Sequence, residues 1–265
     1  MKFFDSLIHV QPDGGWLNNK DDSGIDRLLQ DIDGRDYRAC LVAIAGYQRN
    51  EDLVTLSMQH PELFVPIAGF NPVAYDSTAE RQSALTSLAA TGFPGIKLHP
   101  RLNEYDPLDP CCLETIEYAG QAGLIVFLDT LFRQKGRVTA YAPDVVDRIV
   151  NDCNPQRLVL LHGGASSLLD MFEMVRMHEN LILDLSFTLM RYAGSSLDQD
   201  LAFVCRELDQ RVVVGSDYPE YLPSDARQRI GTLMDGLPLA KRENVLYANL
   251  ERLFAGWGGL KSNRI

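Results

Sequence analysis

Five side chains in this chain have the types that acid–base and metal chemistry require, and each stands near the end of a short apolar run. They are Asp5, His9, Asp129, His162 and Asp217. Carboxylates and imidazoles transfer protons in general acid–base catalysis, and the same groups bind divalent metal ions. We therefore expect them to form one site in which water is activated by a metal ion or by a carboxylate base.

Lys97 and His99 add a second pair of polar side chains inside an apolar run. Side chains alternate along a strand, so these two residues are expected on one face. A buried lysine costs free energy unless polar partners are close, which favours a functional role for Lys97. His99 has an equally good explanation as a residue that caps the strand and packs under the next loop.

The first and last apolar runs place their polar residues in the same way. Alternation in the first run predicts Asp5, Leu7 and His9 on one face, with Asp5 deep in the fold and His9 at its mouth. In the last run, Asp217 comes soon after three valines, which predicts a carboxylate at the mouth of the last strand. Asp129 also has a simpler interpretation as a turn former or a helix N-cap.

These residues can meet only in a fold that brings the ends of many apolar runs together. Eight runs are short, rich in Val, Ile, Leu and Phe, and almost continuously apolar, as parallel strands buried on both faces are. They are Phe3–His9, Ala39–Ile44, Phe64–Phe70, Gly95–His99, Leu124–Asp129, Arg157–His162, Leu181–Ser186 and Arg211–Ser216.

Helical segments alternate with these runs from end to end. They are Ile25–Ile32, Glu51–Gln59, Ser77–Ala90, Cys112–Ala122, Pro143–Cys153, Ser166–His178, Leu197–Asp209 and Leu239–Phe254. Strict alternation predicts an α/β fold, a single-domain (β/α)8 TIM barrel over residues 1–265, with an open doubly wound sheet as the alternative. Barrel enzymes build their active sites at the C-terminal ends of the strands, which is where these polar residues stand.

The composition describes a globular protein and limits its partners. The chain has 265 residues, of which 46% are hydrophobic, and a formal net charge of −11. An acidic surface repels phosphate groups, so we expect a small-molecule substrate, no nucleic acid and no membrane. Five cysteines without a CxxC pair indicate reduced thiols, and no leader or membrane span is recognised. A cytoplasmic protein is therefore expected.

Four segments together resemble the amidohydrolase-related family, the metal-dependent hydrolase and decarboxylase branch of the amidohydrolase superfamily. They are Phe4–His9, Gly92–Pro100, Leu161–Gly164 and Gly215–Pro219, and Asn244–Phe254 is similar to the family's last helix. These segments span nearly the whole chain in the family's order. The resemblance implies a barrel enzyme acting on a small carbonyl compound, and it allows a homo-oligomer.

The family pattern implies a metal site that this chain keeps only in part. The family opens with a His-x-His pair of metal ligands, adds a histidine at the end of strand 5 and an aspartate after strand 8, and uses a strand-6 histidine as acid or base. This chain keeps His9, His162 and Asp217 at the matching positions. Leu7 replaces the first histidine, and Asp129 stands where the strand-5 histidine is expected.

Three outcomes are open at this point. In the first, His9, Asp129 and Asp217 bind one divalent ion, Zn, Mn or Fe, which activates water while His162 moves the proton. In the second, no metal is bound and Asp217 is the base, as in metal-independent lactonases of this superfamily. The carbonyl is then polarised by His162, His9 and Lys97. In the third, the barrel is catalytically silent and serves as a binding or assembly subunit.

The predicted activity is hydrolysis of an ester, lactone or amide by water activated at Asp217. His162, Lys97 and His99 complete the predicted catalytic set. A decarboxylase of the same family is the second reaction type, which a single sequence cannot separate from a hydrolase.

Three further residues are predicted to bind the substrate at the mouth of the barrel. Arg101 and Arg133 follow strand ends, where a guanidinium group can hold a substrate carboxylate through two hydrogen bonds. Tyr218 follows the last strand and is expected to form part of the pocket wall, together with Trp16 and Tyr221.

Overall fold

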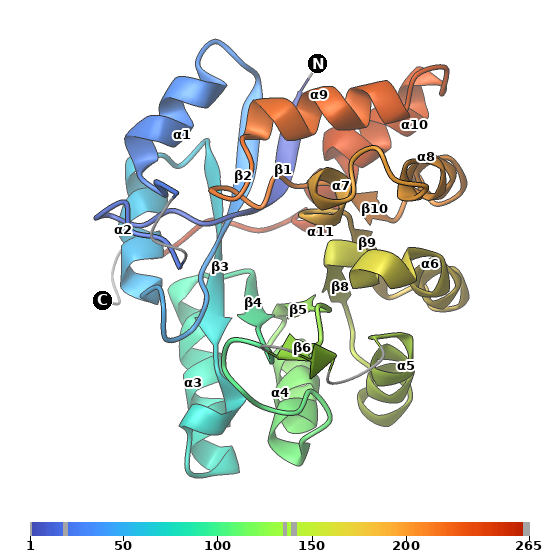
Figure 1. Ribbon diagram of the computed structural model, residues 1–265. Coiled ribbons are helices and arrows are strands. Elements are labelled where there is room, and N and C mark those ends of the chain that lie inside the picture. The colour runs from blue at the N-terminus through green and yellow to red at the C-terminus, as the bar shows by residue number, and fades with distance from the viewer. Residues whose placement is uncertain (1, 18–20, 135–136, 139–141, 262–265) are drawn as a thin grey trace.

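The centre of the molecule is a sheet of eight parallel strands, in the order β1-β2-β3-β4-β5-β8-β9-β10. The computed structural model describes residues 2–17, 21–134, 137–138 and 142–261. The strands are β1 (Phe3–Ile8), β2 (Tyr37–Val42), β3 (Phe64–Phe70), β4 (Gly95–Leu98), β5 (Ile125–Asp129), β8 (Leu158–Leu161), β9 (Leu181–Asp184) and β10 (Val212–Val213). Figure 1 shows them inside a ring of helices.

Hydrogen bonds between the first and last strand segments close this sheet into a barrel. The backbone N–H of Ser6 donates to the carbonyl oxygen of Val214 at 3.0 Å, and the N–H of Asp217 donates to the carbonyl oxygen of Leu7 at 3.0 Å. An open sheet would leave both edges unpaired. The predicted single-domain (β/α)8 barrel is therefore confirmed, and the open doubly wound sheet is excluded.

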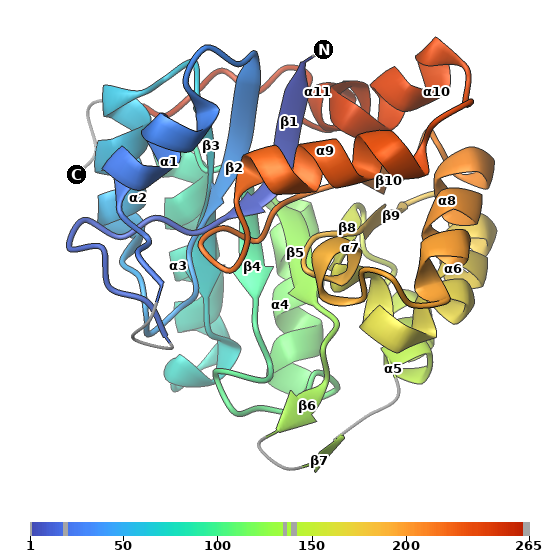
Figure 2. The ribbon, with the colours of Figure 1, turned by 45° about the horizontal axis from the view of Figure 1, so that its top comes forward.

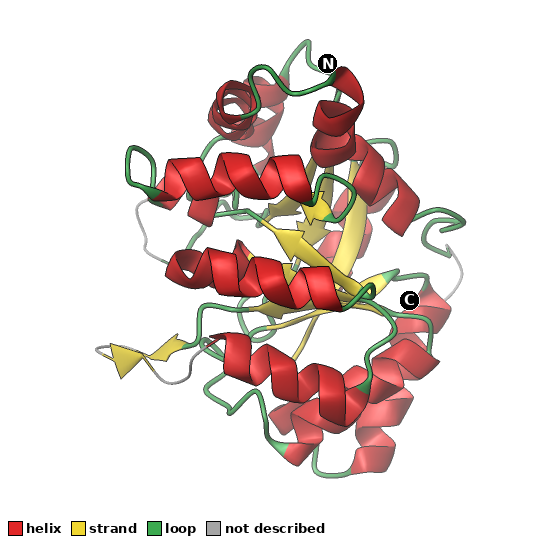
Figure 3. Cartoon of the chain, turned by 90° about the vertical axis from the view of Figure 1, so that its right-hand side faces the viewer, coloured by secondary structure: helices red, strands yellow, loops and turns green. Residues whose placement is uncertain are grey.

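Helices cover the outside of the barrel, as Figure 3 shows. They are α1 (Ile25–Ile32), α2 (Asn50–Gln59), α3 (Thr78–Thr91), α4 (Pro110–Gln121), α5 (Ala142–Cys153), α6 (Leu168–Met177), α7 (Thr188–Arg191), α8 (Leu197–Glu207), α9 (Pro223–Leu233), α10 (Leu239–Glu243) and α11 (Asn249–Leu253). Short 3-10 segments occupy Pro72–Ala74 and His162–Ser167, and a π-helical turn joins α10 to α11 at Asn244–Ala248. No helix in the described part of the chain is long and apolar enough to cross a membrane.

Several elements lie where the sequence pattern predicted none, among them the short helix α7. Helix α9 occupies the stretch between the last strand and Leu239, and Pro223 begins it at a position that favours a helix start. An antiparallel hairpin, β6 (Arg133–Gln134) and β7 (Arg137–Val138), follows β5. Figure 2 shows this hairpin projecting beyond the barrel, and its strands are too short for a periodicity argument to detect.

The core has two layers because alternate residues of each strand point to opposite sides. Inward-pointing side chains form one apolar cluster that includes Phe4, Val42, Phe127 and Val159. Phe254, which follows α11, joins this cluster, with ring centroids 6.0 Å from Phe4 and 6.5 Å from Phe127. The C-terminal segment therefore plugs the N-terminal end of the barrel. Outward-pointing side chains pack against the helices in a second, larger cluster.

One strand breaks its alternation, and the prediction for Asp5 is wrong for that reason. The pairing of β1 with β2 shifts by one residue between Asp5 and Ile8, which is a β-bulge. Phe4 and Leu7 both lie in the inner cluster, three positions apart. Asp5 instead accepts hydrogen bonds from the hydroxyl of Tyr37 at 3.1 Å and from the Ser216 hydroxyl at 2.6 Å. It therefore lies outside the catalytic ring.

Candidate active site

A cavity of about 360 Å³ opens at the C-terminal ends of the strands, the end at which barrel enzymes carry their active sites. Its polar lining consists of His9, Lys97, His99, Arg101, Asp129, His162, Asp217 and Glu220. The structure thus brings together all four predicted catalytic residues and all three predicted metal ligands.

Asp129, the last residue of β5, lies between two imidazoles. Its Oδ2 is 3.2 Å from Nε2 of His99 and 3.2 Å from Nε2 of His162. Its Oδ1 accepts a hydrogen bond from the backbone N–H of Leu131 at 3.0 Å. Within the described residues, Oδ2 receives no hydrogen bond of good angle. The carboxylate oxygen therefore lies between the two imidazole nitrogens, at the same distance from each.

The two histidines beside Asp129 differ in charge. Burial by itself raises the pKa of Asp129, but His99 and His162 hold that pKa well below its ordinary value. Burial lowers the pKa of His99 to about 3. Burial also disfavours the charged form of His162, but contact with Asp129 raises its pKa overall. Asp129 and His162 therefore form an ion pair, with His99 as a neutral neighbour.

His9 follows β1, and the backbone of β2 defines its tautomer. Nδ1 lies 2.6 Å from the carbonyl oxygen of Val42, so we assign the proton to Nδ1, which donates to that oxygen. Nε2 is then an acceptor, and Nζ of Lys97 lies 3.4 Å from it. Trp16 stacks on the imidazole with ring centroids 5.1 Å apart. Burial lowers the pKa of His9 well below its ordinary value, so the ring is neutral.

Asp217 follows β10 and is the acidic residue best placed to act as a base. Its side chain reaches the cavity at 8% exposure, whereas Asp129 is fully buried. Oδ1 of Asp217 lies 3.7 Å from Nε2 of His9. Burial raises the pKa of Asp217, and the charges of His162 and Lys97 offset this only in part. A carboxylate with a raised pKa is a better proton acceptor than an ordinary one.

The backbone at several site residues is held in an unfavourable conformation. His162, Phe187 and Asp217 line the cavity, and their φ angles are 65°, 59° and 58°, in the left-handed region that side chains disfavour. Such strain persists only where neighbouring contacts enforce it. At Asp217 the enforcing contact is Asp5, which accepts hydrogen bonds from both the backbone N–H and the hydroxyl of Ser216.

The predicted substrate-binding residues have different locations. Arg101 lines the cavity, and its Nε is buried without a hydrogen-bond partner among the described residues. Tyr218 does not line the cavity, because its hydroxyl donates to the backbone carbonyl oxygens of Asp22 and Gly24 at 3.1 and 2.9 Å. Arg133 lies in β6, and its side chain is outside the described residues.

Sequence reasoning missed three residues that surround His162. The ring of Phe187 meets the imidazole edge-on, with centroids 5.7 Å apart. Oγ of Ser186 lies 3.2 Å from Nδ1 of His162, and Asp184 accepts the backbone N–H of His162 at 3.1 Å. Asp184 and Ser186 share one face of β9 and its extension, so alternation in that run was a usable signal. Phe187 has no such signal, because its position depends on its left-handed backbone.

The predicted metal ligands line one cavity, but their donor atoms are directed elsewhere. Oδ2 of Asp129 faces His99 and His162, and the free nitrogen of His9 faces the Lys97 amine. An ion bound at that nitrogen would lie against the amine. Across the part of the chain that the structure describes, no three His, Cys, Asp or Glu side chains form a group that could hold a metal ion. The arrangement does not fit a metal.

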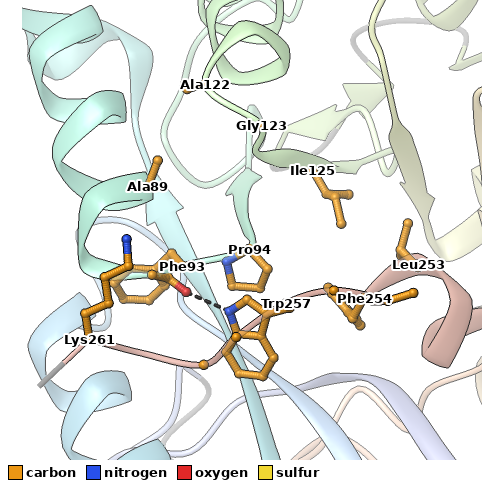
Figure 4. Close-up of a pocket in the computed structure, with 15 residues that line it drawn as sticks. Ala89, Phe93, Pro94, Ala122, Gly123, Ile125, Leu253, Phe254, Trp257 and Lys261 are labelled. Carbon is orange, nitrogen blue, oxygen red and sulfur yellow. Dashed lines mark hydrogen bonds between the residues drawn. The ribbon is translucent and has the colours of Figure 1, made fainter.

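A second cavity, of about 410 Å³, lies at the opposite end of the barrel, and Figure 4 shows it from close by. Phe93, Pro94, Ile125, Phe254 and Trp257 form its apolar lining. The indole N–H of Trp257 donates to the carbonyl oxygen of Gly92 at 2.8 Å, which seats the C-terminal segment against the loop before β4. Lys261 is the ionisable side chain among the described residues that line this cavity, so the cavity lacks the carboxylates and imidazoles of the first one.

The closed barrel and the polar cavity with acid–base residues at its C-terminal end define a TIM-barrel enzyme. A sequence profile of the amidohydrolase family matches residues 24–256, and the chain therefore belongs to the amidohydrolase family. It is an amidohydrolase-like enzyme, as the resemblance implied. Comparison with curated protein sequences gave no significant match.

Solved structures with the same fold include proteins with different activities. An uncharacterised TIM-barrel protein from Bordetella bronchiseptica has a TM-score of 0.78 and 16% identity, over 96% of this chain and 99% of that one. A probable 2-pyrone-4,6-dicarboxylic acid hydrolase from Acinetobacter baumannii, with citric acid bound, has a TM-score of 0.69 and 16% identity, over 96% and 99%. A 5-carboxyvanillate decarboxylase from Novosphingobium aromaticivorans, with bound manganese, has a TM-score of 0.64 and 12% identity, over 86% and 80%.

Proposed function

We propose that this enzyme hydrolyses a small carboxylate-bearing lactone or ester without a metal ion, with Asp217 as the general base. The observation that carries the proposal is the position of the Lys97 amine. It lies 3.4 Å from Nε2 of His9, where a metal ion bound to that nitrogen would have to sit. The Lys97 amine thus occupies the position beside His9 that a metal ion would otherwise occupy.

The catalytic roles follow from where each group can act. Asp217 reaches the cavity and has a raised pKa, so its carboxylate accepts a proton from the attacking water. The carbonyl oxygen gains negative charge as water adds, and N–H groups of Lys97 stabilise that charge by hydrogen bonding. The ion pair of His162 with Asp129 supplies a fixed positive charge on the same cavity wall.

Substrate recognition is assigned to Arg101. Its guanidinium lines the cavity, and no ion-pair partner within 4.0 Å is found for it among the described residues. A substrate carboxylate would supply that partner through charge-assisted hydrogen bonds. The probable 2-pyrone-4,6-dicarboxylic acid hydrolase that shares this fold is named for a lactone carrying two carboxylates, which supports a substrate of this kind.

The open cavity supports an enzyme rather than a barrel without catalytic activity. Leu7 is fully buried in the inner cluster, yet Asp217 and Lys97 line an open cavity of about 360 Å³. A barrel that had lost its activity would be expected to fill this cup with apolar side chains.

Elemental analysis of protein purified without chelator tests the metal-free assignment directly. We expect less than about a tenth of an equivalent of any divalent ion. Hydrolysis of a panel of carboxylated lactones, followed by proton release, is expected to be unchanged by EDTA. Near-stoichiometric metal together with EDTA-sensitive turnover would overturn the assignment and restore the three-ligand site. Turnover by loss of CO2 in place of hydrolysis would identify a decarboxylase.

A further inference from the structure

Lys97 is a buried amine that faces the cavity without an acidic partner. It is 2% exposed and lies at the centre of β4, among the lining residues. Its ordered contact is the one with Nε2 of His9, at 3.4 Å. No carboxylate oxygen of the described residues lies within 4.0 Å of Nζ. Lysines held in an ion pair stay charged, whereas a buried lysine without one is readily deprotonated.

The imidazole of His9 is oriented so that it can accept a proton from the Lys97 amine. The proton on Nδ1 of His9 is committed to the carbonyl oxygen of Val42. Nε2 of His9 therefore presents a lone pair toward Nζ, which is the geometry of a base that accepts a proton from the amine.

We propose that Lys97 forms an imine with the ketone group of a short keto acid whose carboxylate is bound by Arg101. This activity goes beyond hydrolysis, because the lysine becomes covalently attached and Asp217 is not the base that starts the reaction. The small cavity, of about 360 Å³, suits a ligand of few carbon atoms. The buried, unpartnered Nε of Arg101 is the polar group that selects an acid over a simple ketone.

The covalent step balances without another reactant. The Nζ lone pair adds to the ketone carbon, the carbon–nitrogen bond forms, and the ketone oxygen takes a proton to become a hydroxyl group. His9 accepts the proton that the nitrogen loses and returns it to the ketone oxygen. The protonated His162, which lines the same cavity, delivers the second proton, and the hydroxyl group then leaves as water. The product is a protonated imine on Nζ plus one water molecule. The electron-poor imine carbon then withdraws electrons from the neighbouring carbon–carbon bond.

Reductive trapping on the wild-type protein tests the proposal. The full chain is incubated with pyruvate, sodium borohydride is added to deliver hydride to the imine carbon, and the adduct is located by peptide mass mapping. We expect a reduced pyruvyl adduct on Lys97 at several times the level found on any other lysine. No adduct on Lys97, or equal labelling of the exposed lysines, would overturn the proposal. Hydrolysis is not involved, so this result is independent of the hydrolase assignment.

Three variants refine the test. Lys97→Arg keeps a long side chain with N–H donors but cannot form an imine, and it should abolish the adduct at this position. Lys241→Arg is the matched control, because that lysine lies on the surface and donates to the backbone of Arg206. Arg101→Met should lower trapping of pyruvate about tenfold or more while leaving trapping of acetone, which has no carboxylate, within about twofold. Equal loss with both probes would remove Arg101 from the proposal.

Discussion

At the scale of single residues, the protonation state of each ionisable group in the site depends on the groups beside it. Asp129 keeps His162 charged, while the carbonyl oxygen of Val42 keeps the proton of His9 on Nδ1. Asp217 is left as the carboxylate that both reaches the cavity and has a raised pKa. The carboxylates at the ends of β5 and β10 therefore have different roles. At Asp129 the neighbouring imidazoles lower the pKa more than burial raises it, whereas at Asp217 burial has the larger effect.

Asp217→Asn tests the base at this scale. The amide keeps the size of the side chain but cannot accept a proton, so kcat/KM for the best lactone should fall by about 10²–10⁴-fold. Circular dichroism and thermal unfolding should remain close to wild type, since among the described residues the side chain has one ion-pair contact, with His9 at 3.7 Å. A loss of less than tenfold in a folded variant would show that another group activates the water.

The pH dependence of hydrolysis should follow Asp217. As a base, it is active only when ionised, so kcat/KM should increase with pH through the pKa of this carboxyl, which lies above the ordinary value of 3.8. The rising limb should vanish in Asp217→Asn and persist in Tyr221→Phe, whose ring packs against Phe187 with centroids 6.2 Å apart. Initial-rate measurements across a pH series give the comparison. A limb that survives in the asparagine variant would belong to a different residue.

At the scale of elements, the bulge in β1 packs against the turn after β10. Asp5 is turned out of the barrel by the bulge and accepts hydrogen bonds from Ser216, the residue before Asp217. Gly215 lies where these segments touch. A Cβ at Gly215 would be 2.6 Å from Oγ of Ser6 and 2.8 Å from Oδ1 of Asp5. The base is therefore positioned by a close backbone approach that only glycine allows.

Gly215→Ala should displace this turn. The added methyl group meets backbone as well as side chain, because it would also lie 2.8 Å from the amide nitrogen of Leu7. We expect a loss of about 1–3 kcal/mol in the free energy of unfolding. The matched control is Gly231→Ala in α9, where a Cβ meets nothing within 4 Å and alanine favours the helix by up to about 1 kcal/mol. Urea denaturation of both variants should give changes of opposite sign.

Asp5 should also make the stability depend on pH. Burial raises its pKa to about 7 in the folded chain, whereas an aspartate in the unfolded chain keeps the ordinary pKa of 3.8. Its contribution to stability is therefore fully present below pH 3.8 and is lost as the pH rises toward 7, at about 1.4 kcal/mol per unit. Asp5→Asn cannot titrate and should flatten the unfolding free energy across that window. An unchanged slope in the variant would assign the dependence to other groups.

At the scale of the whole molecule, the two ends of the barrel serve different purposes. The C-terminal end holds the polar cavity, whereas the N-terminal end is closed by the segment after α11 (Figure 4). Phe254 packs there against Phe4 and Phe127, which extend the inner core down to the plug. Apolar packing therefore extends from the inner core to the N-terminal end of the barrel.

Phe254→Ala should destabilise the barrel without altering the chemistry of the site. Removing a buried aromatic ring leaves a cavity and costs about 3–5 kcal/mol. Phe254→Leu, the control, keeps most of the volume and should cost clearly less. Thermal unfolding measures both, and activity per folded molecule should remain close to wild type in each. A large loss of kcat in a variant that is still folded would mean that the plug also shapes the cavity.

The sequence by itself determined the barrel, the family and the general composition of the site. The apolar runs and their alternation with helices carry that information locally, because a parallel strand buried on both faces must be apolar throughout. Lys97 and His99 were correctly placed together, since β4 is regular and its side chains alternate. Asp129, His162 and Asp217 were correctly brought to the same cavity, since each stands at the C-terminal end of a strand.

The tertiary structure decided which of these residues face one another. Asp5 lies outside the catalytic residues because β1 has a bulge where it pairs with β2. The local sequence pattern does not indicate this bulge. Tyr218 points away from the cavity because its hydroxyl donates to the carbonyl oxygens of Asp22 and Gly24, which are far away in the sequence. The position of the Lys97 amine against His9 depends on strands that are far apart in sequence. Alternation follows from local backbone geometry, whereas register, backbone strain and contact between strands arise only when the barrel closes.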